Sequence, residues 1–262
     1  MDIRNPSVAG LFYPANPESL HRDIDSFLHA VPPLPPRRPK AIVSPHAGYV
    51  YSGPVAAFAY AAVRPFAADI QRVVLFAPAH RLPFRGLAVP SSDCFRTPLG
   101  DVPVDRDGVA TALQQPGVEM LDAAFDQEHA IEVQLPFLQE AVGDFHLVPV
   151  VAGMADDHAV TGVMAALWGG EETLFVISSD LSHYLDYESA RERDQHTRLA
   201  IETLRPEALE GHDACGYIPL RGLLSVARDK GLHVETLDMR NSGDTAGPRD
   251  RVVGYGSYAV YS

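Results

Sequence analysis

Residues 41–53 read AIVSPHAGYVYSG, and this stretch shows how the chain is built. Its first part, Ala41–Val43, is an apolar run typical of a short buried strand, and the alanine-rich segment 54–63 is typical of a helix. His46 stands between the two, followed by a glycine and two tyrosines. A strand that ends in such a loop and leads into a helix is the repeating unit of α/β folds, which bind ligands at that end of the strands.

The same alternation continues along the chain. Strands rich in β-branched and aromatic residues are predicted at 72–77 and 173–178, and both should be buried on two faces because they lack polar alternation. Further strands are expected at 86–89, 102–104, 145–151, 233–237 and 252–260, the first two of these as an inserted hairpin. Helices are expected after the cap Asn16 and at 105–113, 127–141 (divided or kinked by Pro136), 156–168, 188–204 and 216–230. We therefore predict one α/β domain over residues 1–262, with an open sheet covered by helices on both faces.

Composition narrows the classes of partner. The chain is 46% hydrophobic and 21% charged, with a net charge of −13. Nucleic acids and acidic membrane surfaces are bound by clustered Lys and Arg, so the sequence argues against both. The N-terminus lacks an apolar signal core, the longest alanine-rich apolar run is too short to span a bilayer, and two cysteines make no disulfide framework. We expect a protein of the reducing cytoplasm.

Histidines follow several of the predicted strands. His46, His80 and His183 all come directly after a strand, and His129 stands at the start of a predicted helix. If the strands are parallel neighbours, the first three imidazoles meet at one edge of the sheet. Neutral imidazoles bind Zn, Cu, Fe or Ni, and two histidines with a carboxylate suit non-haem Fe(II). For His129 the alternative is a purely local role, such as a hydrogen bond to a backbone carbonyl.

Two aspartates and two cysteines are further candidates for functional or structural roles. Asp180, just before His183, would orient a histidine or act as a general base, with a turn or cap residue as the alternative. Asp244 lies in a polar, glycine-spaced loop that would supply a carboxylate if it folds over the edge of the sheet. We expect structural roles for Cys94 and Cys215, the latter as a small buried residue at a helix start.

Taken together, these motifs resemble those of the Memo family, called AmmeMemoRadiSam system protein B in prokaryotes. The matching motifs, in order, are PHAGYxYSG at 45–53, APAH at 77–80, EHAIExxLPF at 128–137, SSDLSH at 178–183 and NSGD at 241–244. The resemblance runs nearly end to end. It implies an open mixed α/β sheet similar to that of class III extradiol dioxygenases, which use non-haem Fe(II).

The resemblance also implies roles for individual residues. His46 and His80 match two metal-ligand positions, and His129 and His183 match histidines of the same pocket. A cysteine completes the metal site in animal members, and an ungapped comparison places it at Thr245, beside Asp244. Asp244 is then the expected substitute as third ligand, and a hard oxygen ligand favours iron or manganese over copper.

The functional expectation is a non-haem, Fe(II)-dependent oxidoreductase of the dioxygenase type acting on a small substrate, with Cu or Zn as other metals. The expected site consists of metal ligands His46, His80 and Asp244, catalytic residues His129, His183 and Asp180, and pocket residues Tyr49, Tyr51 and Thr245. The alternatives are a non-catalytic scaffold that binds a metal, peptide or metabolite, and a metal-dependent hydrolase. The prokaryotic family name further implies a functional link to a radical-SAM protein and an AMMECR-type protein.

Overall fold

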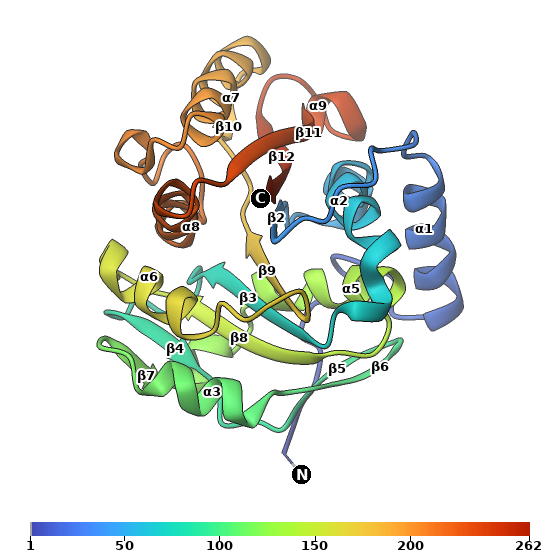
Figure 1. The fold of residues 1–262 in the computed structure, drawn as a ribbon. Helices are drawn as coiled ribbons and strands as arrows, with labels where there is room; N and C mark the ends of the chain where they lie inside the picture. The colour runs from blue at the N-terminus through green and yellow to red at the C-terminus, as the bar shows by residue number, and fades with distance from the viewer. Residues whose placement is uncertain (1) are drawn as a thin grey trace.

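A mixed sheet of nine strands forms the centre of the protein in the computed structural model, which describes residues 2–262 (Figure 1). The strand order is β10-β12-β2-β9-β3-β8-β4-β7, and β11 pairs with β12 outside this path. The bounds are β2 Ala41–Ser44, β3 Arg72–Pro78, β4 Leu87–Val89, β7 Val118–Met120, β8 His146–Ala152, β9 Thr173–Ser178, β10 His183–Leu185, β11 His233–Asn241 and β12 Val252–Tyr261. The strands β2, β9, β3 and β8 are parallel neighbours, flanked by antiparallel β12 and β4. The predicted open mixed α/β fold is confirmed.

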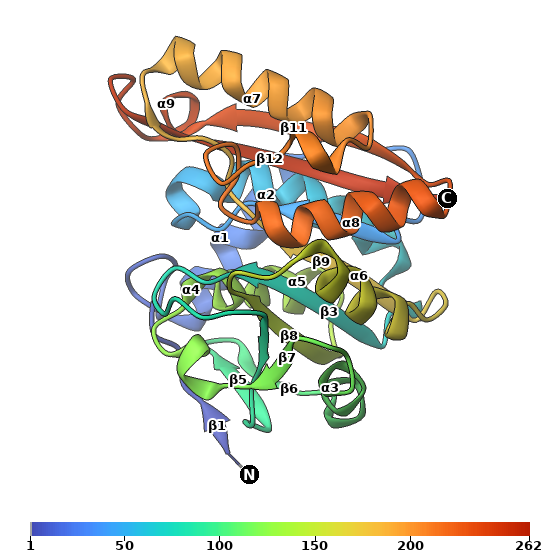
Figure 2. The ribbon, with the colours of Figure 1, turned by 90° about the vertical axis from the view of Figure 1, so that its left-hand side faces the viewer.

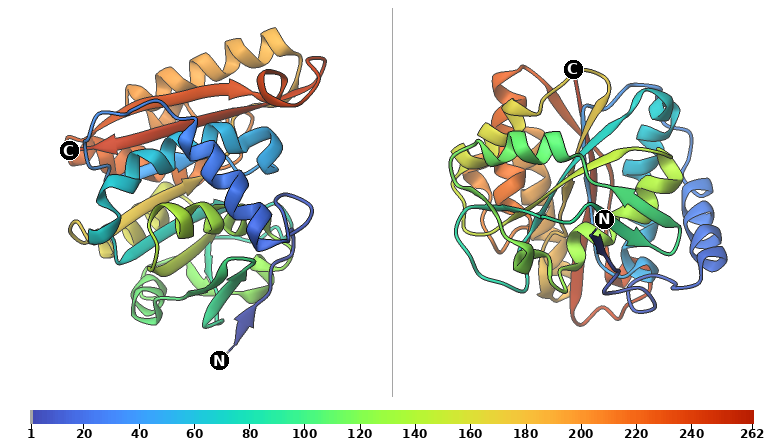
Figure 3. Two further views of the ribbon diagram at one scale, coloured as in Figure 1. Left: turned by 90° about the vertical axis from the view of Figure 1, so that its right-hand side faces the viewer. Right: turned by 90° about the horizontal axis from the view of Figure 1, so that it is seen from below.

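Helices cover both faces of this sheet. One side carries α6, α7 and α8, and the other carries α1, α2 and α5 (Figure 1). Figure 2 faces the first side and shows α7 running across β11 and β12, while the left view of Figure 3 faces the second, where α1 lies outermost. The helix bounds are α1 Pro17–His29, α2 Tyr49–Val63, α3 Arg106–Leu113, α4 His129–Glu132, α5 Gln134–Ala141, α6 Asp157–Ala166, α7 Tyr187–Glu202, α8 Tyr217–Asp229 and α9 Ser242–Thr245. Within residues 2–262 no helix is both long and apolar enough to cross a membrane.

A small second sheet corrects one expectation. It consists of β1 Ile3–Arg4, β5 Cys94–Thr97 and β6 Gly100–Pro103, with β5 and β6 forming the hairpin. We expected the hairpin partner of residues 102–104 at 86–89, but that segment is β4 and pairs with β8 in the main sheet. The chain reverses instead at Pro98–Leu99, directly after β5. Cys94 is buried in β5, in keeping with its expected structural role.

The predicted helix over 127–141 is divided, but not at its proline. The break falls at Val133, between α4 and α5, and Pro136 lies inside the first turn of α5. A proline is tolerated there because the first backbone N–H groups of a helix have no intrahelical partner. His129 is the first residue of α4, as the sequence predicted for the start of a helix.

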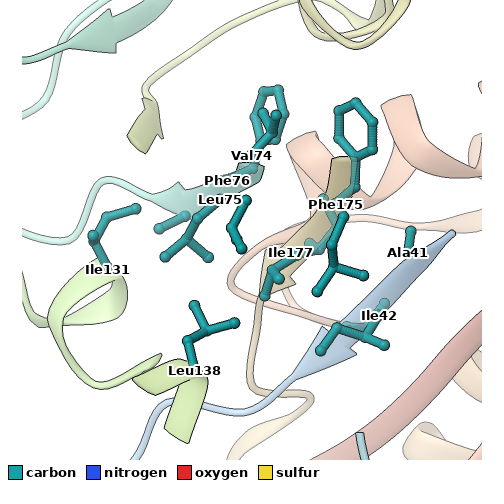
Figure 4. Packing of buried hydrophobic residues seen from close by; sticks show 14 of the residues in the cluster. Ala41, Ile42, Val74, Leu75, Phe76, Ile131, Leu138, Phe175 and Ile177 are labelled. Atoms are coloured by element: carbon teal, nitrogen blue, oxygen red, sulfur yellow. The ribbon is translucent and has the colours of Figure 1, made fainter. Parts of the chain in front are cut away.

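Burial of the central strands fixes where their ends lie. Every residue of β2 and β9 is buried, and their side chains pack with β3 and with Ile131 and Leu138 of α4 and α5 (Figure 4). In this register Ser44 pairs with Ser178, so β2 and β9 end side by side. The loops that carry His46 and Asp180 therefore leave the sheet at the same edge.

Candidate metal centre

A cavity of about 580 Å³ opens at the edge where the parallel strands end. All four candidate histidines line this cavity. The lining residues are Phe12, His46, Ala47, Gly48, Tyr51, His80, His129, Asp180, His183, Tyr184, Ser242, Gly247, Pro248, Arg251, Val253 and Tyr255. A concave site of this size, with apolar walls and a few convergent polar groups, suits a small molecule.

His46 is fixed by contacts from β9 and the loop after it. Its backbone N–H donates to Oδ1 of Asp180 at 2.8 Å, and its ring Nδ1 lies 2.8 Å from Oγ of Ser178. The residue is 1% exposed, and burial, together with the neighbouring His80, holds the pKa of His46 well below its ordinary value. The imidazole is therefore neutral at neutral pH.

The hydrogen bonds of Ser178 settle which nitrogen of His46 carries the proton. The Ser178 hydroxyl donates to the Ala130 carbonyl at 2.6 Å and accepts from the Gln134 amide at 2.8 Å. A hydroxyl has a single hydrogen, so toward His46 it is an acceptor and Nδ1 is the protonated nitrogen. Nε2 of His46 is left with a free lone pair, as a metal ligand requires.

His80 is oriented in the same way by Glu128. The carboxylate of Glu128 accepts the backbone N–H of His80 at 2.6 Å and lies 2.9 Å from its ring Nδ1. A carboxylate only accepts, so Nδ1 donates and Nε2 is again free. Burial raises the pKa of Glu128, but the hydrogen bonds from His80 and from the Ala130 N–H outweigh it and lower the pKa to about 2.

Cys215 completes the cluster. Its Sγ lies 3.3 Å from Nε2 of His46, and its backbone N–H donates to the Asp180 carbonyl at 3.3 Å. Burial raises the pKa of the Cys215 thiol, so without a metal it is protonated and donates toward His46. A bound cation would replace that proton, because coordinated thiols are deprotonated.

Within residues 2–262, two overlapping groups of side chains could hold a metal ion: His46, His80 and Cys215, and His80, Glu128 and His129. In each, the ligand atoms lie within 4.8 Å of one another. Glu128 already accepts three hydrogen bonds, which fits a residue that orients His80 rather than a ligand. The first group has two unprotonated imidazole nitrogens and an ionisable sulphur, so its donor set fits a divalent transition metal better.

His129 and Asp180 lie beside this cluster. The His129 ring stacks on His80 with centroids 4.8 Å apart, and its buried Nδ1 has no hydrogen-bond partner among the described residues. Burial and the nearby His46 lower the pKa of His129 to about 4, so it is a neutral base at neutral pH. Burial raises the pKa of Asp180, although the His46 N–H opposes this.

The remaining predicted residues divide into two sets. His183, at the start of β10, and Tyr51 line the cavity outside the two metal-binding groups. Tyr49 is buried and donates to the Val133 carbonyl at 2.7 Å, and Thr245 donates to the Ser242 carbonyl at 3.3 Å. Neither of these two lines the cavity.

The structure does not bring Asp244 to the histidines. Its carboxylate accepts from the Tyr187 hydroxyl at 2.5 Å and from the Asn241 N–H at 3.1 Å, as part of the capping box of α9. The loop does reach the cavity, through Ser242, Gly247 and Pro248, but the Asp244 carboxylate is engaged in the cap of α9 and does not line the cavity. Cys215, to which we gave only a structural role, occupies the position beside His46.

A sequence signal for Cys215 exists in the glycine that follows it. A Cβ atom on Gly216 would lie 2.7 Å from Cβ of Ser179 and 2.8 Å from the Ser178 carbonyl oxygen. Only glycine allows the chain to approach the end of β9 so closely. A Cys-Gly pair before a helix is therefore a sequence signal for close backbone approach. Glu128, also given no role from sequence, carried no comparable signal.

Fold and site together define a mixed α/β protein with a histidine–cysteine cluster at the carboxyl edge of its parallel strands. A family model described as "Memo-like protein" matches residues 4–259. Proteins called "MEMO1 family protein" are 36% identical in Methanococcoides burtonii (98% of this chain, 100% of the relative), 35% in Aquifex aeolicus (97% and 98%) and 36% in Aeropyrum pernix (99% and 100%). The chain belongs to the Memo family.

Proposed function

We propose that this protein is a metal-dependent oxidoreductase of the dioxygenase type, with a divalent metal ion held by His46, His80 and Cys215. The observation that carries the proposal is the convergence of two oriented imidazole rings that line one cavity with the thiol beside them. Three protein ligands leave coordination positions open, and Fe(II) with open positions supplies the activation of O₂. A cavity of about 580 Å³ supports a small molecule as the substrate.

Each neighbouring residue has a task in this proposal. His129, which lines the cavity and is neutral, accepts a proton from a hydroxyl group of the substrate. Asp180 fixes the His46 backbone, and Glu128 fixes the His80 ring. Phe12, whose ring lies 4.8 Å from that of His129, shields this side of the cavity from water.

The sulphur ligand alters the expected metal preference. An oxygen ligand from Asp244 would have favoured iron or manganese, whereas a thiolate also suits copper and zinc. The same ligand set with Zn(II) would activate water, which makes a metal-dependent hydrolase the second candidate function. Hydrolysis of ester or amide probes without O₂ distinguishes it from an oxygenase, and a cavity that binds metal and ligand without turnover would identify a non-catalytic scaffold.

Metal analysis after anaerobic reconstitution with Fe(II) tests the proposal. We expect one ion per chain, lost in His46→Ala, His80→Ala and Cys215→Ser. Cys94→Ser is the matched control, since it changes a cysteine buried in the small sheet and should keep the ion. Retention of a full equivalent by Cys215→Ser, or no uptake by the unmodified protein, would contradict the assigned ligand set. O₂ consumption across a panel of small phenolic substrates then tests the oxidoreductase activity.

A further inference from the structure

Arg251 lines the cavity with its hydrogen-bonding capacity unused. Across residues 2–262 no carboxylate pairs with its guanidinium and no hydrogen bond involves it; its Cζ lies 5.2 Å from the centroid of the Tyr184 ring. The chain has 34 Asp and Glu against 21 Lys and Arg, so potential partners are abundant. A guanidinium has five N–H donors in a fixed fork, and here all five are available to a ligand.

The neighbouring Arg249, in the same loop, has ionic, aromatic and hydrogen-bonding partners within the protein. Its guanidinium lies 4.2 Å from the Tyr187 ring centroid and 3.8 Å from Oδ1 of Asp244, and its Nε donates to the Gly243 carbonyl. Arg249 thus stabilises the loop, whereas Arg251 contributes no such bond. The guanidinium of Arg251, an exposed residue that lines the cavity, is therefore available to a ligand.

The local backbone sets Arg251 at the mouth of the cavity. It directly precedes β12, whose first residues Val252 and Val253 pair with β10. Within β10, Tyr184 has a φ of 60° and is 64% exposed. A left-handed conformation is costly for a tyrosine, and it places the ring where the guanidinium can lie over it.

The cavity therefore has two chemically different parts. The histidine and cysteine cluster supplies metal-binding atoms, and Arg251 supplies a positive charge. Aromatic walls lie among the lining residues, contributed by Phe12, Tyr51 and Tyr255. Among the residues that line the cavity, Arg251 is the sole Lys or Arg, and Asp180 adds a carboxyl group, so a singly charged anion fits better than a doubly charged phosphate.

We propose that Arg251, held over Tyr184, is the subsite for the carboxylate of a small aromatic substrate whose other end reaches the metal cluster. This inference rests on the proposed function for its metal end only. Guanidinium and carboxylate match as a planar, two-bond pair, which is stronger than a neutral hydrogen bond. The remaining substrate surface packs against the aromatic walls.

Calorimetric titration with two probes that differ by one carboxylate tests the subsite. The probes are catechol and 3,4-dihydroxybenzoate, titrated under anaerobic conditions into the metal-free and the Fe(II)-loaded protein. We expect the unmodified protein to bind 3,4-dihydroxybenzoate about 10- to 100-fold more tightly than catechol, the range for a hydrogen bond to a charged group. In Arg251→Gln this preference should shrink to near unity while the affinity for catechol stays unchanged.

Arg64→Gln is the matched control. Arg64 is exposed and directly follows α2, the helix whose first turn lies beside the cavity. The 15 residues of α2 place Arg64 roughly 22 Å from Tyr49, the first residue of the helix, at 1.5 Å per residue. This variant loses the same charge far from the site and should keep the full preference for the carboxylate.

The outcomes separate the two proposals. Equal preference in Arg251→Gln and the unmodified protein, no preference in the unmodified protein, or no measurable binding of either probe would overturn the carboxylate subsite. A second outcome is a preference for the carboxylate that requires Arg251 and is the same with and without Fe(II), with an affinity for catechol that the metal does not change. This outcome would support the subsite and count against the proposed metal function alone.

Discussion

Sγ of Cys215 lies 3.3 Å from Nε2 of His46, although 169 positions separate the two residues in the chain. The contact exists because β2 and β9 end side by side and the loop before α8 folds back on the end of β9. A protonated thiol against a neutral imidazole is a stable arrangement without a metal. With a metal, the same two atoms become ligands and the thiol proton is released.

Glu128→Gln should weaken metal binding by about 10- to 100-fold, the usual effect of losing a residue that orients a ligand histidine. Both carboxylate oxygens of Glu128 accept hydrogen bonds from His80. In the glutamine one of them becomes an NH₂ group, a donor that would face an N–H group of His80. Competition with a chromogenic chelator measures the change. Glu119→Gln, at an exposed position of β7, should leave the affinity as it is. Unchanged affinity in both variants would remove Glu128 from the site.

Glu132→Gln should loosen the N-terminal arm. This buried carboxylate accepts from the N–H and hydroxyl of Ser7, the N–H of Val8 and the hydroxyl of Tyr13. Losing hydrogen bonds to a charged group typically costs about 1.5–3 kcal/mol, and the arm carries Phe12 against His129. Faster hydrogen exchange confined to residues 7–14 is the expected result. Glu140→Gln, which removes the half-buried partner of the exposed His21, serves as control and should not speed exchange there.

Gly216→Ala should both destabilise the fold and displace Cys215. The added methyl group would lie 2.7 Å from Cβ of Ser179, and overpacking of this kind costs typically 1–3 kcal/mol, about what a denaturant titration resolves. Metal uptake should fall with it. Gly162→Ala is the matched control, because its nearest neighbour, Gln115, lies at 3.6 Å and α6 accepts alanine. A Gly216→Ala protein of normal stability and metal content would refute the close-approach argument.

The metal-free protein should lose stability as the pH falls from about 7 toward 4. Burial and His46 lower the pKa of His129 from 6.5 to about 4, so between these values the unfolded chain binds more protons than the folded one. The free energy of unfolding therefore decreases with falling pH, by on the order of 3 kcal/mol for His129 once the pH is below both values. His46, whose pKa is also lowered, adds to the loss.

Urea titrations of the metal-free protein at a series of pH values measure this dependence. His129→Gln removes the group and should flatten the curve between pH 6.5 and 4, whereas His196→Gln, at an exposed position of α7, should leave the slope unchanged. A slope that is the same with and without His129 would assign the acid sensitivity to other groups.

The fold and the histidine positions were accessible from sequence because they follow from local patterns. Apolar runs that end in His46 and His80 locate strand ends, and parallel strands bring their ends to one edge. The third member of the cluster follows from no such pattern, because Cys215 reaches the edge through a loop that precedes α8.

The position of Asp244 could not be predicted from the composition of its loop either. Asn241 and Asp244 stand three residues apart, the spacing of a capping box, and in the protein they close the first turn of α9. That local bond competes with any role at the sheet edge. The short strand β10, with Tyr184 in a left-handed conformation, was likewise absent from the expected elements, because three residues carry no periodicity.

X-ray absorption at the metal edge of the reconstituted protein tests the central claim most directly. The account predicts one sulphur scatterer from Cys215 together with two imidazole ligands, and loss of the sulphur shell in Cys215→Ser but not in Cys94→Ser. A metal-bound protein whose spectrum shows oxygen and nitrogen ligands alone, unchanged by Cys215→Ser, would contradict it.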